Sequence, residues 1–162
     1  MKLRRIFLYV FLSFSILYIS VCTYMYIFQR NFLYHPYQNN HLRGEKLNPE
    51  VKEVFVTSTE GITLKSWFYK NPKNTYTVLF FHGNAGELGN RIYKLNELKN
   101  LNLNYLIISW RGFSGNKGSP TEQGLYSDAR SAIDWLEKNN ILKNKIILYG
   151  ESLGTGVAIE VA

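Results

Sequence analysis

Residues 150–154 read Gly-Glu-Ser-Leu-Gly and place one serine between two glycines, each two positions away. This G-x-S-x-G pattern is typical of a nucleophilic serine held in a sharp turn between a strand and a helix. In such a turn the two backbones cross so closely that the flanking positions have no room for a Cβ atom. The pattern therefore predicts that Ser152 can attack a carbonyl carbon.

Attack on a carbonyl places negative charge on its oxygen, so the site also needs hydrogen-bond donors for an oxyanion. The backbone N–H of Leu153, directly after the serine, is the first expected donor. The second is expected from residues 82–86, His-Gly-Asn-Ala-Gly, a small-residue loop that leads into a helix. We assign it to the N–H of Asn84, with Ala85 as the close alternative.

Three apolar runs predict strands buried on both faces of a parallel sheet: 77–81, 105–108 and 145–149. Ser152 follows the third run, which is the context that the G-x-S-x-G pattern requires. Segments 53–58 and 62–69 show strand alternation on either side of a Glu-Gly turn and predict a hairpin.

Helices are predicted between these strands. Leu88, Ile92, Leu95 and Leu98 recur at helical spacing. Residues 119–122, Ser-Pro-Thr-Glu, predict a capping box with proline at the first helical position. The chain from Leu153 onward, rich in Gly, Ala and Val, predicts a helix buried on several sides. Alternating strands and helices predict an α/β fold with a mostly parallel sheet flanked by helices.

The N-terminal segment predicts a membrane anchor. Residues 6–28 carry no charge, and as a helix of about 34 Å they match a hydrocarbon core of about 30 Å. The basic residues within 1–5 favour a cytoplasmic N-terminus. A cleaved signal peptide and a lipoprotein site at Cys22 are the alternatives. The first fits less well because its apolar region spans roughly 7–15 residues, and the second because bulky Val21 precedes the cysteine.

Composition excludes several functional classes. With 46% hydrophobic and 19% charged residues, the chain is not of a disordered or low-complexity class. The net charge of +7 lies mostly before residue 53, where seven Lys and Arg stand against two Glu. Residues 53–162 carry twelve basic and ten acidic residues. A nucleic-acid partner is therefore not expected.

Metal and cofactor binding are not expected either. The sequence has one cysteine, three histidines and no C-x-x-C or H-E-x-x-H pattern for zinc. The glycine-rich segment 112–118 suggests nucleotide binding as an alternative, but this segment lacks both G-x-G-x-x-G and the Gly-Lys-Ser/Thr order. We expect no metal and no cofactor.

The motifs taken together resemble the α/β-hydrolase fold, and within it the membrane-anchored bud-emergence-suppressor group. The matching stretches stand in family order between residues 29 and 162: 29–36, 81–86, 111–115, 118–128 and 149–154. The chain departs from the family at Ser109, where relatives usually have Asp, and at Ser114, where a glycine is usual. The resemblance implies a serine hydrolase of ester, thioester or other acyl bonds that needs no cofactor.

The resemblance also implies a catalytic triad that is incomplete here. In this fold an acid and then a histidine follow the serine along the chain. After Ser152 the sequence has only Glu160 as an acid and no histidine. A serine without its base loses on the order of 10⁶ in kcat. Of the upstream histidines, His35 and His41 lie in the tether, and His82 is expected to be structural.

The sequence therefore predicts a basic flank at 1–5, a transmembrane anchor at 6–28, a tether at 29–52 and the N-terminal half of an α/β-hydrolase domain at 53–162. We expect a truncated fold whose last strand is an unpaired edge, with the bilayer, an unidentified acyl substrate and a second polypeptide that supplies the C-terminal half as partners. The alternatives are a non-catalytic remnant and a binding domain displayed on a membrane.

Overall fold

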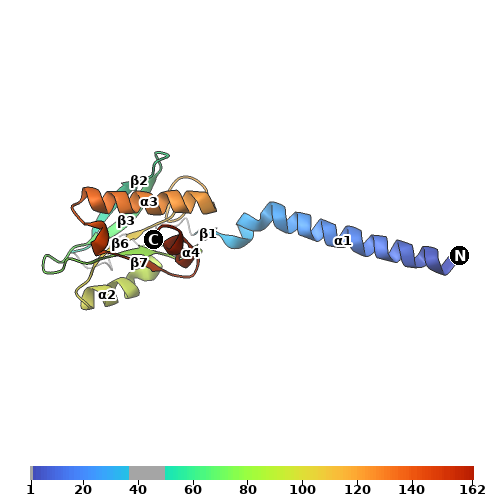
Figure 1. Ribbon diagram of the computed structural model, residues 1–162, viewed down its shortest axis with the longest axis horizontal. Helices are drawn as coiled ribbons and strands as arrows, with labels where there is room; N and C mark the ends of the chain where they lie inside the picture. Colours follow the sequence, from blue (N-terminus) through green and yellow to red (C-terminus); the bar gives the residue numbers. More distant parts are fainter. Residues whose placement is uncertain (1, 37–49) are drawn as a thin grey trace. The chain divides into compact units, whose positions relative to one another are not determined.

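The computed structural model describes residues 2–36 and 50–162, which form two compact units, Met1–Leu33 and Tyr34–Ala162 (Figure 1). The first unit is one helix, α1 (Lys2–Leu33), in which no residue is buried. This helix is long and apolar enough to cross a membrane, as the uncharged run predicts. It extends beyond the expected anchor, because residues 29–33 are helical.

The second unit is built on a five-stranded sheet of order β2-β3-β6-β4-β7. Its strands are β2 (Lys52–Thr57), β3 (Thr63–Tyr69), β4 (Thr77–Phe81), β6 (Asn104–Ile108) and β7 (Ile146–Gly150). The pairs β4–β6 and β4–β7 are parallel, and β3 is antiparallel to both of its neighbours. Only β3 therefore runs against the others, which confirms a mostly parallel sheet and the predicted hairpin.

Helices cover both faces of this sheet, with α3 (Glu122–Lys138) on one and α2 (Ile92–Asn100) on the other (Figure 1). The one-turn 3₁₀ helix η1 (Leu88–Arg91) precedes α2, and a second, η2 (Lys143–Lys145), precedes β7. Side chains of β4 alternate between two cores: Leu79 and Phe81 join the α3 side, and Val78 and Phe80 join the α2 side. This double burial explains why β4 is a continuous apolar run.

Two expectations of burial are wrong. Strand β7 lies at the edge of the sheet, where Ile147 is 43% and Tyr149 42% exposed, although its apolar run predicted a buried strand. The edge position itself agrees with the expected unpaired edge. Helix α4 (Leu153–Glu160) buries only Gly154 and Val157. Because β7 has a neighbour on one side only, the helix that follows it is covered on one side only.

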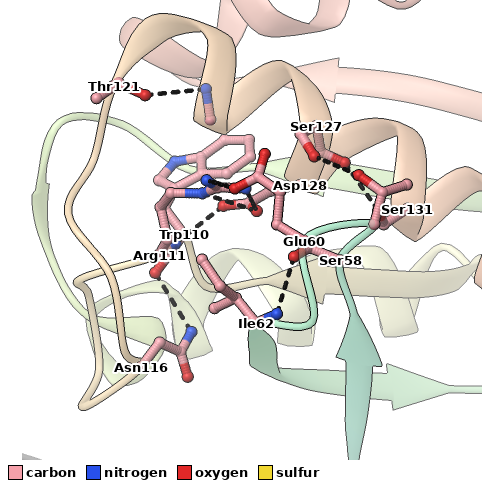
Figure 2. Close-up of polar contacts among 12 residues, drawn as sticks. Ser58, Glu60, Ile62, Trp110, Arg111, Asn116, Thr121, Ser127, Asp128 and Ser131 are labelled. Atoms are coloured by element: carbon pink, nitrogen blue, oxygen red, sulfur yellow. Dashed lines mark hydrogen bonds and ion pairs between the residues drawn. The ribbon is translucent and has the colours of Figure 1, made fainter.

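Helix α3 begins two residues later than predicted. Its N-cap is Thr121, whose hydroxyl accepts a hydrogen bond from the Gly124 N–H at 3.0 Å. A buried ion pair joins this helix to the glycine-rich loop that follows β6: Arg111 donates to Asp128 from its backbone N–H, Nε and Nη2 (Figure 2). Glu60, in the β2–β3 turn, pairs with the same guanidinium. Asp128 is thus fully buried.

Candidate active site

Ser152 lies in the turn between β7 and α4, as its motif predicts, and its backbone has φ 51° and ψ −116°. A positive φ is uncommon for a residue with a side chain and stores strain that the surroundings must hold. A Cβ atom on Gly150 would lie 2.4 Å from the Thr155 Cα, and one on Gly154 would lie 2.1 Å from the Phe81 carbonyl oxygen. The glycines are therefore required for the strand and helix to cross here, and Ser152 stays exposed.

The loop predicted to supply the second oxyanion donor lies against this turn. A Cβ atom built on Gly83 would lie 3.4 Å from both the Ser152 Cβ and the Glu151 carbonyl oxygen. The Glu151 N–H also donates to the Phe81 carbonyl at 2.9 Å. Residues 81–83 and 150–154 thus form one packed unit, although 67 positions separate His82 from Tyr149 in the sequence.

His82 holds the first peptide of this loop. Its ring is fully buried, and burial, assisted by the positive charge of Arg91, lowers the pKa of His82 to about 3. The neutral ring donates from Nδ1 to the Gly83 carbonyl at 2.8 Å and accepts at Nε2 from the Trp110 N–H at 3.3 Å. With both nitrogens engaged, His82 cannot take a proton from Ser152, in agreement with the structural role expected for it.

The residues after α1 hold the next peptide. His35 and Pro36 form β1 (His35–Pro36), which pairs in parallel with β5 (Ala85–Gly86), and the His35 N–H donates to the Asn84 carbonyl at 2.9 Å. The preceding residue, Tyr34, is 8% exposed and belongs to the core. Residues 34–36 of the segment predicted as a tether over 29–52 therefore pack on the domain. Residues 37–49 of that segment, which include His41, lie outside the described residues.

Glu151 links the turn to the start of α2. Its carboxylate pairs with Arg91 at 3.1 Å and with Lys94 at 2.7 Å. Partial burial of Glu151 opposes ionisation, but the hydrogen bond from Lys94 and the charge of Arg91 outweigh it and lower the pKa of the carboxyl group. Only a quarter of the Glu151 side chain is exposed.

The structure brings the three predicted site residues to one region. Ser152 and Leu153 are consecutive at the start of α4, where the first N–H groups of a helix lack partners within it. Asn84 is half-buried in the loop that packs on Ser152. Glu160, the acid that follows Ser152 in the sequence, pairs with Arg130 at 2.9 Å.

Sequence reasoning missed three contributors to the site: Arg91, Lys94 and the backbone of His35. Arg91 and Lys94 lie three residues apart on consecutive turns, which is the spacing of neighbours on a helix surface. That spacing predicts that the two side chains share a helix face, but it does not identify the carboxylate that they contact. His35 contributes through its backbone N–H, and because almost every residue type has one, the sequence does not mark this position.

Known proteins resemble the chain over most of its length. It is 33% identical over 146 residues to an uncharacterized protein of Mycobacterium tuberculosis, a match of 88% of this chain and 52% of that protein. It is 36% identical over 120 residues to protein bem46 of Schizosaccharomyces pombe, covering 71% and 40%. An uncharacterized membrane protein of Saccharomyces cerevisiae, YNL320W, is 35% identical over 116 residues, covering 70% and 40%. The chain thus spans about half the length, or less, of these relatives.

Solved structures share the fold. A Pyrococcus furiosus esterase, Pf2001, aligns with a TM-score of 0.63 at 23% identity, over 79% of this chain and 50% of that one. An alpha-beta hydrolase of Vibrio vulnificus aligns with a TM-score of 0.62 at 26% identity, over 71% and 40%. No protein-family model matches the chain. On this sequence and structural likeness, the chain belongs to the α/β-hydrolase superfamily and resembles its bem46-like members.

Proposed function

We propose that this chain carries the nucleophile and oxyanion site of a membrane-anchored serine hydrolase acting on ester, thioester or other acyl bonds. The observation that carries the proposal is the left-handed Ser152, which is exposed in a strand-to-helix turn with the Gly83 loop packed against it. Strained residues of this kind persist where the surrounding structure fixes them, and they cluster at active sites.

In the proposed reaction the Ser152 Oγ bonds to the acyl carbon while its proton passes to a base. The N–H groups of Leu153 and Asn84 donate to the oxyanion, and the leaving alcohol or thiol departs with a proton. Water then hydrolyses the acyl-enzyme and restores Ser152. Since His82 is engaged on both nitrogens, we infer that the base and its orienting acid come from outside the described residues, on this polypeptide or on a second one.

The membrane part of the proposal rests on α1 and on the relative described as a membrane protein. The basic residues at its start favour a single-pass helix with a cytoplasmic N-terminus. Protease protection of tags at the two ends of the chain in sealed vesicles tests this orientation. In vesicles sealed with their cytoplasmic face outward, protection of the N-terminal tag from added protease would contradict this orientation.

Labelling with a fluorophosphonate probe tests the nucleophile. In membranes from cells that express the gene, we expect a labelled band that withstands an alkaline carbonate wash and disappears in the Ser152→Ala variant. Ser119→Ala, at an exposed serine in the loop before α3, is the matched control and should keep the label. Equal labelling of Ser152→Ala would contradict the assignment of the nucleophile, and no labelling of any variant would favour the non-catalytic alternative.

A further inference from the structure

The three residues that follow α1 form part of the site region. Tyr34 lies in the core cluster that includes Phe81 and Trp110, at the end of β4 and after β6. His35 and Pro36 are the strand partner of Ala85 and Gly86, and these two short strands make a separate two-stranded sheet. The last two residues of segment 29–36, which the hydrolase resemblance singled out, therefore contact the oxyanion loop.

This contact fixes the orientation of a peptide group. In a planar trans peptide, the carbonyl and the N–H point in opposite directions, and the described residues contain no cis peptide. The His35 N–H holds the Asn84 carbonyl at 2.9 Å, so the N–H of Ala85 must face the opposite way. The same reasoning applies one peptide earlier, where His82 Nδ1 holds the Gly83 carbonyl and thereby directs the N–H of Asn84.

Both candidate donors of the oxyanion loop are thus oriented from their carbonyl sides, one by a buried side chain and one by the juxtamembrane backbone. Ala85 is exposed and Asn84 only half-buried, so packing restrains these peptides less than it restrains Phe81 or His82. A hydrogen bond from outside the loop is then an effective restraint on the peptide plane. An oxyanion donor stabilises charge only when it is held in place before the reaction.

We propose that Tyr34–Pro36 form a juxtamembrane clamp, in which the His35 N–H is a positioning group for the oxyanion loop. The reactivity of Ser152 then depends on the chain that joins the domain to α1, and this joining segment is not an inert tether. The inference rests on the proposed function of Ser152 and goes beyond it, because it assigns a role to residues remote from the nucleophile in sequence.

The experiment removes the backbone N–H of residue 35 and separates this change from loss of the His35 side chain. His35→Pro lacks the donor, whereas His35→Ala keeps it and is the matched control, since the His35 side chain is exposed. A third variant carries an ester in place of the amide at position 35, which deletes the N–H and preserves the backbone shape. For each full-length protein, the fluorophosphonate reaction is resolved into probe affinity and maximal rate, and thermal unfolding is recorded.

Complete loss of one oxyanion donor costs about 10²–10³ in rate, so a misdirected donor should slow the maximal labelling rate roughly tenfold to a hundredfold. We expect this loss in His35→Pro and in the ester variant, with probe affinity and unfolding temperature near those of His35→Ala. If His35→Pro unfolds, the ester variant decides. Labelling of the ester variant at the rate of His35→Ala overturns the clamp, as does an equal loss in His35→Ala. Labelling that survives Ser152→Ala overturns the proposed function itself, and the clamp with it.

Discussion

Ser152 and Glu151 show how single residues hold the site. A left-handed backbone at a residue with a side chain costs on the order of 1–3 kcal/mol, so neighbouring contacts must fix it. Glu151 provides such contacts on the preceding residue: its N–H bonds to β4, and its carboxylate bonds to Arg91 and Lys94 beyond the oxyanion loop. The ion pairs therefore tie the turn to η1 and α2, the helices that follow this loop.

Replacing Glu151 by Gln should lower the free energy of unfolding by about 1–3 kcal/mol at neutral pH, because Arg91, which is 7% exposed, keeps its charge and loses its carboxylate. The pKa of Glu151 is lowered in the folded state. Its stabilisation is therefore present above the ordinary pKa of about 4.3 and is lost as the pH falls through the lower folded value. The difference between wild type and variant should shrink below about pH 4.

Denaturant unfolding at several pH values measures this difference. Glu137→Gln is the matched control, because Glu137 pairs with Lys143 at 3.4 Å on the surface, where such pairs contribute less than about 1 kcal/mol. An equal effect of the two substitutions, or a difference that does not depend on pH, would show that the Glu151 ion pairs do not stabilise the fold.

At the scale of elements, the site depends on how closely β7, β4 and α4 approach one another. Gly154 in the first turn of α4 touches the end of β4, and Gly150 touches the backbone of α4 itself. Elsewhere the Arg111–Asp128 pair fastens the glycine-rich loop to α3 (Figure 2). At Ser152 the elements are thus joined by close backbone contact as well as by the Glu151 ion pairs, and at the glycine-rich loop by a buried ion pair.

Two glycines of α4 should respond to alanine in opposite directions. A Cβ on Gly154 would overlap the Phe81 carbonyl, and backbone cannot yield as a flexible side chain does. Gly154→Ala should therefore cost about 3 kcal/mol or more of the free energy of unfolding. Nothing lies within 4 Å of a Cβ on Gly156, so Gly156→Ala should stabilise the protein by about 0.5–1 kcal/mol through helix propensity. Thermal unfolding of both variants measures these changes, and similar stability of the two variants would contradict the close approach of α4 to β4.

At the scale of the whole molecule, the described sheet is closed by helices on its faces but open at β7. An edge strand presents unpaired backbone N–H and C=O groups to other chains. Ile147 and Tyr149 are each about two-fifths exposed on this edge. The described domain therefore presents a surface suited to strand pairing.

We expect residues 34–162, expressed without α1, to self-associate through β7. Ile147→Lys should raise the soluble, monomeric fraction severalfold, because an edge lysine opposes strand pairing. Leu142→Lys is the control, since Leu142 is 66% exposed but lies outside the strands. Sedimentation velocity measures the distribution. A wild-type fragment that is monomeric and unfolds in one sharp transition would contradict this expectation.

Local sequence patterns predicted the strand-to-helix turn at Ser152, the strands β4 and β6, the hairpin and the long apolar helix. These features are local: a glycine spacing, a run of apolar side chains or a period of two reports the burial and backbone geometry of its own segment. The predicted nucleophile and oxyanion residues follow from such local patterns, and the structure brings their segments together.

Which segments meet depends on long-range packing, which local sequence patterns do not report. The pairing of β1 with β5 joins residues that lie 50 positions apart in the sequence. Each of these strands has two residues, and a segment of two residues is too short to show a periodic pattern. The burial of Asp128 and the half-burial of Glu151 depend on arginines and a lysine from other elements, and an isolated carboxylate in the sequence looks solvated. The apolar run of β7 indicates burial, yet burial needs a neighbour on each side, and strand order is a property of the assembled sheet.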